Sequence, residues 1–183
     1  MWSNFSTITV YFLGGRSLSL NQIKFPAYFV GHSLGAIISI SLANKHPELI
    51  KAIFAAGMPG KVSPLINSAF KLFIKGPMQT LKDSDLKNHL GWRERTLIEM
   101  PLFTLEQISA SFADIDFTNS LPPVDCPVHF ACGRFDPIAL CSHIKEMHKK
   151  IPDSTLQIFE WGGHNFMDAS PAAFNAWISR YLI

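Results

Sequence analysis

A serine flanked by glycines stands where the sequence changes from a strand-like to a helix-like pattern. The segment Gly31–His32–Ser33–Leu34–Gly35 fits the G-x-S-x-G pattern of a nucleophile elbow, a sharp strand-to-helix turn that exposes a serine hydroxyl. Glycines two positions before and after the serine leave room for that turn. The start of the following helix supplies backbone N–H groups for a developing oxyanion. The spacing predicts Ser33 as a nucleophile and Leu34 as one oxyanion donor.

A base and an acid follow the serine in the sequence. A serine hydroxyl is a poor nucleophile at neutral pH, so it needs a base beside it, and a carboxylate must orient that base. Asp136 follows one strand-like segment and His164 follows the next, which gives the order serine, acid, histidine. Because sites in open α/β sheets assemble at the carboxyl ends of the strands, we expect both near Ser33. Asp153 and Asp168 are alternatives for the acid.

The other histidines and the cysteines carry no comparable signal. His32 lies inside the elbow, and we expect it to point away from the serine hydroxyl and either to serve in packing or to support the catalytic residues from behind. The three cysteines are an odd count without paired metal-ligand spacing, so neither a disulfide framework nor a metal site is expected. Cys132 is interpreted as a small core residue. No cofactor is predicted.

The elements that must position these residues alternate between strands and helices. Strand-like runs cover 27–30, 50–56, 128–132 and 156–159. Helical patterns cover 34–44 and 138–151, and a last helix begins at Pro171 with Phe174, Trp177, Ile178 and Tyr181 facing inward. This order predicts an α/β fold with a mostly parallel sheet flanked by helices. The stretch 58–119 is predicted to be a helical insertion, which leaves 1–57 and 120–183 as the core.

Three phrases are similar to segments of the α/β-hydrolase family. FVGHSLG, HFACGRFDPI and EWGGHNFMDASPAAFNAWISRYL resemble the family's nucleophile, acid and histidine segments, and the resemblance runs from about Phe25 to the C-terminus. It implies that 58–119 is a cap over an acyl pocket. It also implies a serine hydrolase, similar to esterases and lipases, that acts on a small apolar ester or acyl substrate through Ser33, Asp136 and His164. Cap aromatics suggest an apolar pocket, or simply pack the cap: Phe70, Phe73, Trp92 and Phe103.

The part of the sequence before the elbow is short for this family. Only 32 residues precede Ser33, whereas the family usually places three or four strands before the elbow strand, so the N-terminal part of the fold is interpreted as short or truncated. The strand-like run 8–13 could take the place of the missing neighbour of 27–30, with Gly14 or Gly15 donating the second oxyanion N–H. Otherwise the strand edge is exposed and self-association is expected. A catalytically impaired fragment that serves as a binding or interaction module is therefore the alternative function.

Composition excludes several other classes of protein. The chain is 48% hydrophobic and 16% charged, with a net charge of +2, which is typical of a globular domain. No basic cluster exceeds Lys149–Lys150, so no nucleic-acid partner is expected. The uncharged stretch 25–44 is interrupted by glycine and serine, so no stable membrane span is expected. With no signal-peptide pattern and few cysteines, we expect a cytoplasmic location.

Overall fold

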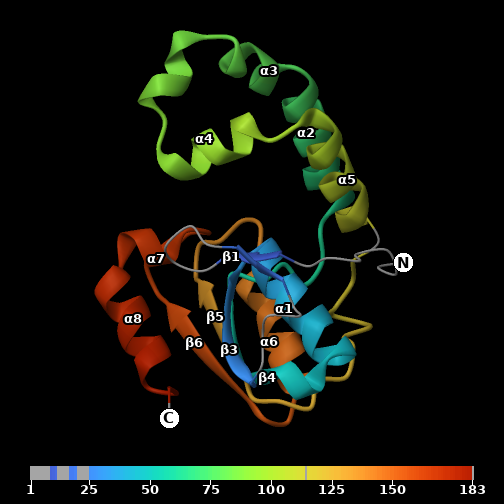
Figure 1. The fold of residues 1–183 in the computed structure, drawn as a ribbon, viewed down its shortest axis with the longest axis vertical. Coiled ribbons are helices and arrows are strands. Elements are labelled where there is room, and N and C mark those ends of the chain that lie inside the picture. The colour runs from blue at the N-terminus through green and yellow to red at the C-terminus, as the bar shows by residue number, and fades with distance from the viewer. Residues whose placement is uncertain (1–8, 12–16, 20–24, 114, 183) are drawn as a thin grey trace. The chain divides into compact units, whose positions relative to one another are not determined.

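The structure is a computed structural model that describes residues 9–11, 17–19, 25–113 and 115–182 (Figure 1). The chain divides into two units. Unit 1 combines Met1–Pro59 with Leu121–Ile183, and unit 2 is Gly60–Ser120. The predicted site residues that are described lie in unit 1, whereas unit 2 is helical.

A four-stranded parallel sheet forms the centre of unit 1. Its strands in spatial order are β3 (Ala27–His32), β4 (Ile50–Ala56), β5 (Val128–Gly133) and β6 (Ser154–Phe159). Each neighbouring pair is parallel. Parallel strands need crossover connections, so the carboxyl ends of all four strands meet at one edge of the sheet. The α/β fold class with a parallel sheet is therefore confirmed.

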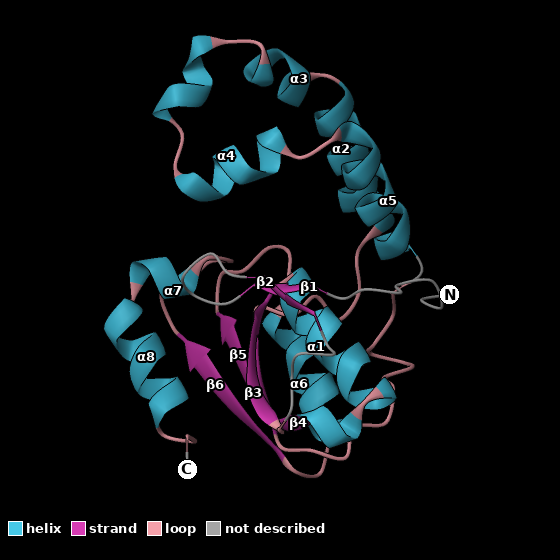
Figure 2. Cartoon of the chain, viewed as in Figure 1, coloured by secondary structure: helices cyan, strands magenta, loops and turns pink. Residues whose placement is uncertain are grey.

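Helices cover both faces of this sheet. α1 (Leu34–Lys45) and α6 (Cys141–Lys150) lie on one face, and α8 (Pro171–Ser179) lies on the other, preceded by α7 (Phe166–Ala169) (Figure 2). The 3-10 turn η2 (Pro47–Leu49) joins α1 to β4. Because a parallel sheet is buried on both sides, β4 and β5 consist almost entirely of buried residues instead of alternating.

The inward face of α8 agrees with the apolar pattern of the sequence. Trp177 is buried, and its ring meets the edge of Phe54 with the ring centroids 5.5 Å apart. The other residues of the predicted stripe, Phe174, Ile178 and Tyr181, are partly buried against the same cluster. Aromatic pairs in this arrangement stabilise by roughly 0.5–1.5 kcal/mol beyond the area they bury. The predicted helix and its stripe are confirmed.

The elbow strand differs from the prediction. β1 (Thr9–Tyr11) pairs antiparallel with β2 (Ser17–Ser19) in a separate two-stranded sheet, and residues 8, 12 and 13 of the predicted run lie outside the described residues. Among the described strands, β3 has β4 as its single neighbour. The described residues of the run 8–13 therefore do not take the place of the missing neighbour of β3. The short connection from β1 to β2 favours local antiparallel pairing over a parallel pairing with β3.

Unit 2 consists of helices and 3-10 turns. They are α2 (Pro64–Lys75), α3 (Pro77–Lys82), η3 (Asp85–His89), α4 (Trp92–Glu99) and α5 (Leu102–Ala113). At the base of the unit, Lys61 forms a β-bridge and an ion pair with Asp116. None of the helices in the described segments of the chain is long and apolar enough to cross a membrane.

The helices of unit 2 pack around their own small core. Four buried apolar side chains form it: Ile74, Met78, Ile98 and Leu105. Between α2 and α5, the buried Ser109 hydroxyl donates a 2.7 Å hydrogen bond to the Asn67 side-chain carbonyl, so both polar groups are satisfied. That this unit acts as a cap stays a prediction.

One buried histidine in the core is sensitive to pH. His129 of β5 is 7% exposed, stacks on Tyr181 with ring centroids 3.8 Å apart, and pairs through Nδ1 with the Thr155 hydroxyl at 2.9 Å. Burial lowers the pKa of His129 below its usual 6.5 and outweighs the opposing pull of Asp153. In the unfolded chain the same ring takes up a proton at the ordinary pKa. The folded state is therefore destabilised as the pH falls through about 6.5.

We expect the free energy of unfolding to fall between pH 7 and pH 5, and we expect His129→Gln to reduce that fall. Glutamine does not titrate, so it removes the difference in protonation between the folded and unfolded states at this position. Denaturant unfolding followed by circular dichroism at both pH values measures the effect. His89→Gln, at an exposed site in unit 2, is the matched control and should keep the wild-type pH dependence. An unchanged acid slope in His129→Gln contradicts the assignment.

Candidate active site

The backbone at Ser33 has the strained geometry that an elbow requires. Ser33 has φ 55° and ψ −115°, and it is the one non-glycine residue with positive φ in the described part of the chain. Such a conformation costs on the order of 1–3 kcal/mol and persists only where the surroundings enforce it. Here the Ser33 N–H donates to the carbonyl of Ala56 at the end of β4, at 2.9 Å. The Ser33 carbonyl in turn accepts the first hydrogen bonds of α1.

The two glycines of the motif differ in what they contribute. A Cβ on Gly31 would lie 2.4 Å from the backbone carbon and oxygen of Gly35, a contact that no side chain tolerates. A Cβ on Gly35 would meet nothing within 4 Å. Both glycines were expected to leave room for the turn. The room is needed at Gly31, where the start of α1 folds directly back over β3, and not at Gly35.

The structure brings together the three residues predicted for nucleophile, base and acid. Ser33 follows β3, Asp136 follows β5 and His164 follows β6, so all three lie at the carboxyl edge of the sheet. His164 Nε2 is 3.0 Å from Ser33 Oγ, and His164 Nδ1 is 2.8 Å from Asp136 Oδ2. With the carboxylate accepting from Nδ1, Nε2 is left to accept the hydrogen of the serine hydroxyl.

Asp136 also holds the loop on which it lies. Its Oδ1 accepts from the backbone N–H groups of Ile138 and Ala139, both at 2.8 Å. These bonds close a turn at 136–139, and α6 begins at Cys141, three residues after the predicted start at Ile138. The Asp136 side chain is fully buried. The two alternative acids, Asp153 and Asp168, are not the carboxylates paired with the His164 ring.

The acid and histidine loops touch through their backbones. A Cβ on Gly133 would lie 2.3 Å from the carbonyl oxygen of Gly163 and 2.4 Å from that of Gly162. Arg134 N–H donates to Phe159 O at 3.0 Å, and Phe135 N–H donates to Gly162 O at 2.9 Å. Gly133 is therefore required for the approach of Asp136 to His164. The sequence signal for it was a glycine at the end of a strand-like run, which the motif reasoning passed over.

His32 lies against the histidine loop. Its Nε2 donates to the backbone carbonyl of His164 at 2.9 Å, and the two rings are 4.7 Å apart between centroids. Gly57, with φ +54°, packs beside it, because a Cβ there would lie 3.4 Å from the His32 ring and 3.5 Å from Asp136 Oδ2. His32 thus contacts the loop that carries His164 as well as packing in the elbow.

The oxyanion donors are described in part. Leu34 is the first residue of α1, and the first N–H groups of a helix have no partner within the helix. The helix N-terminus also favours negative charge. The other proposed donors, Gly14 and Gly15, lie outside the described residues.

The cysteines differ from the sequence expectation. Cys132, at the end of β5, and Cys141, at the start of α6, form a disulfide with their Cα atoms 5.7 Å apart. The expectation of no disulfide is wrong here, because the loop between them folds back and returns the chain to the strand that it left. Cys126 is free and buried, and burial raises the pKa of its thiol to about 11.

No metal site is found near these residues. Within the described residues, no group of three or more histidine, cysteine, aspartate or glutamate side chains could hold a metal ion.

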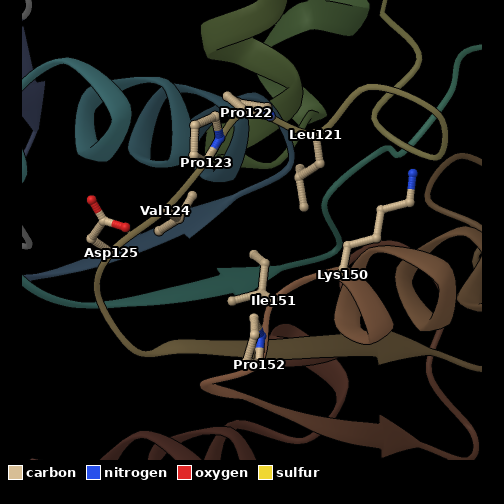
Figure 3. Close-up of a pocket in the computed structure, with 8 residues that line it drawn as sticks. All are labelled: Leu121, Pro122, Pro123, Val124, Asp125, Lys150, Ile151 and Pro152. Atoms are coloured by element: carbon tan, nitrogen blue, oxygen red, sulfur yellow. The ribbon is translucent and has the colours of Figure 1, made fainter.

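A hollow of about 200 Å³ opens at the other end of the sheet, before β5 and β6 (Figure 3). It is lined by residues of two connecting segments: Leu121, Pro122, Pro123, Val124, Asp125, Lys150, Ile151 and Pro152. It contains none of the three predicted site residues.

Comparisons with known proteins agree with this architecture. No protein-family model matches the chain. A proposed carbamate hydrolase, RutD of Caulobacter sp. (strain K31), is 21% identical over 178 residues, which cover 85% of this chain and 65% of RutD. An esterase (EaEST) from Exiguobacterium antarcticum has a TM-score of 0.69 at 18% identity, covering 83% of this chain and 65% of that one. A bromoperoxidase from Bacillus anthracis has a TM-score of 0.74 at 17% identity, covering 89% and 70%.

The chain has the α/β-hydrolase fold. The parallel sheet, the helices on both faces and the solved structures that it resembles agree on this point. The chain spans about 65% of the length of the RutD relative.

The contrast between the two elbow glycines can be measured. Gly31→Ala should destabilise the chain by about 1–3 kcal/mol, because the new methyl overlaps the backbone of Gly35. Gly35→Ala is the matched control and should change stability by less than about 1 kcal/mol, toward stabilisation, because alanine favours the helix. Denaturant unfolding of both variants checks this. Equal destabilisation by the two substitutions would contradict the packing described.

Proposed function

We propose that the chain is a serine hydrolase that cleaves an ester or a related acyl substrate. The observation that carries the proposal is the unbroken chain of hydrogen bonds from Ser33 through His164 to Asp136, at 3.0 and 2.8 Å. Both distances are within hydrogen-bond reach, which is the geometric requirement for a nucleophile, its base and the group that orients the base. The strained backbone of Ser33 supports the same role.

Each residue then has a defined part in the reaction. His164 Nε2 takes the proton as Ser33 Oγ attacks the substrate carbonyl carbon, and it returns that proton to the leaving group. Asp136 keeps Nδ1 protonated and stabilises the imidazolium that forms. The Leu34 N–H donates to the oxyanion, and Gly14 or Gly15 is proposed as the second donor. His164 Nε2 then takes a proton from a water molecule that attacks the acyl carbon, and it returns this proton to Ser33 Oγ as the bond between Oγ and the acyl group breaks.

The substrate is proposed to be small and apolar in its acyl part. In unit 2, which we propose as the cap, Phe70 packs against the unit's own core, so it belongs to the interior of that unit. Phe73 is 37% exposed and Phe103 is 68% exposed, so both are available to an apolar ligand. The relatives named as an esterase and a carbamate hydrolase support attack on a carbonyl that bears an oxygen or nitrogen leaving group.

A binding or interaction module is the alternative function. One observation favours it: among the described strands, β3 has a single neighbour, and Val30 on that strand is 52% exposed. An open strand edge favours pairing with another chain, including a second copy of this one. A folded chain that hydrolyses no ester, although Ser33, His164 and Asp136 are all present, would favour this alternative.

Removal of the nucleophile tests the proposal. Ser33→Ala should lower kcat for a p-nitrophenyl ester by roughly four to six orders of magnitude, because no acyl enzyme can form. Ser142→Ala, at an exposed position on α6, is the control and should keep the wild-type rate. Ester hydrolysis that survives in Ser33→Ala would assign the chemistry to another residue.

Replacement of the acid distinguishes Asp136 from Asp168, one of its two alternatives. Asp136→Asn keeps an oxygen for the N–H groups of Ile138 and Ala139, so the loop should fold, but its amide favours the wrong tautomer of His164. We expect kcat to fall roughly 10⁴-fold. Asp168→Asn, at the exposed alternative acid on α7, should leave kcat close to wild type. The reverse ranking in steady-state ester hydrolysis would move the acid role to Asp168.

A further inference from the structure

The carbonyl of His164 is held by the residue that precedes the nucleophile. His32 Nε2 lies 2.9 Å from His164 O, and a carbonyl can only accept, so the imidazole donates through Nε2. The His32 ring also lies 4.7 Å from the His164 ring between centroids, tilted by 47°. One side chain therefore contacts both the backbone and the ring of the predicted base.

The residues next to His164 in the sequence restrict its backbone little. Gly162 and Gly163 precede it, and glycine restricts the backbone least of all residues. Gly163 and Asn165, its two chain neighbours, are exposed. The His164 side chain is 17% exposed, so burial immobilises it only in part. The donor on the elbow therefore anchors the backbone of His164 itself, in addition to the hydrogen bond that Phe135 N–H donates to Gly162 O.

We propose that His32 is a positioning residue that holds His164 at hydrogen-bond distance from Ser33, an inference that rests on the proposed function. Ser33 and His32 are adjacent on one strained turn, so the nucleophile and the anchor of its base move as a unit. Loss of the donor releases the His164 carbonyl and broadens the separation of Nε2 from Ser33 Oγ. A misplacement of about 1 Å lowers the rate of the chemical step roughly 10²-fold.

Two substitutions that differ by one methylene group test this role. In His32→Gln the amide nitrogen reaches as far as Nε2 and can still donate to His164 O, whereas in His32→Asn it is too short. We expect His32→Asn to lower kcat for a p-nitrophenyl ester roughly 10–100-fold with KM unchanged. His32→Gln should retain most of the wild-type kcat. His32→Leu, with no donor, should match His32→Asn, and circular dichroism checks that each variant folds.

The outcomes distinguish this role from the proposed function. A wild-type kcat in His32→Asn and His32→Leu, with turnover still dependent on Ser33, overturns the role of His32 alone. An equal loss in His32→Gln and His32→Asn also overturns it, because the donor would then make no difference. Absence of Ser33-dependent turnover in the wild type overturns the proposed function, and this role with it.

A separate observation concerns the loop that carries Asp136. The Cys132–Cys141 disulfide joins the end of β5, before this loop, to the first residue of α6, after it, nine positions apart. Within the loop, Asp136 and Ala139 are buried. The remaining side chains are exposed: Arg134, Phe135, Pro137, Ile138 and Leu140. Packing therefore holds the loop weakly, and the disulfide closes it covalently.

The geometry points to the Cys132–Cys141 disulfide as a second positioning element, which holds Asp136 against His164; this too rests on the proposed function. Hydrogen bonds from Arg134 and Phe135 anchor the first half of the loop to the histidine loop. The disulfide anchors the second half to the end of β5. Thiol–disulfide exchange with a dithiol reductant converts the bond to two cysteine thiols and the reductant to its cyclic disulfide, so two electrons and two protons enter the protein.

Reduction and substitution test the disulfide together. Dithiothreitol should lower the wild-type kcat for a p-nitrophenyl ester roughly 10–100-fold, with KM unchanged. Cys141→Ser should have the low kcat with or without the reductant. Cys126→Ser removes the free buried thiol and is the matched control, so it should respond to dithiothreitol as the wild type does. Intact mass after alkylation counts the thiols in each state, and circular dichroism follows folding.

Three results would overturn the role proposed for the disulfide. A wild-type kcat that does not change when alkylation proves that Cys132 and Cys141 are reduced overturns the positioning role. Three alkylated thiols in the purified, unreduced wild type overturn the disulfide itself. A rate that is lost only together with the circular dichroism signal assigns the bond to folding and overturns its role in positioning Asp136.

Discussion

The site depends on the strained turn at Ser33. A non-glycine residue at φ 55° is stable only where other contacts enforce it, and here β4 accepts the Ser33 N–H while α1 begins on its carbonyl. Because Gly31 has no side chain, the backbone of Gly35 can lie directly against it, and the chain can reverse its direction between these two residues. The turn fixes the direction of the serine hydroxyl, and the remaining elements of the site are arranged around that direction.

The parallel sheet brings the three loops that carry the predicted site residues to one place. Three loops from the ends of β3, β5 and β6 meet at one edge because parallel strands share their carboxyl ends. The contact of Gly133 with Gly162 and Gly163 sets how closely the acid and histidine loops approach. Asp136 uses one oxygen to shape its own loop and the other to bond His164, so the folding of the loop and the orientation of the ring are coupled.

Local patterns predicted the elements well, whereas tertiary contacts escaped them. The run 50–56 is a strand with those bounds, and Pro171 begins the last helix, because apolar runs and helix starts are local signals. The Cys132–Cys141 bond depends on how a loop returns to its strand, which spacing alone does not give. α6 begins at Cys141 and not at Ile138, because the chain first makes a turn that Asp136 closes, and the helical apolar pattern does not show that turn. Among the described strands β3 has a single neighbour, and this likewise reflects strand pairing, which is a non-local property.

Covalent labelling identifies directly which serine oxygen reacts. A fluorophosphonate reacts with a serine only where a neighbouring base activates it, and peptide mass spectrometry identifies the modified residue. We predict one adduct, on Ser33, with labelling that is lost in His164→Ala. An adduct on a different serine, or labelling of Ser33 that does not depend on His164, would contradict the central claim that this elbow and this histidine act together.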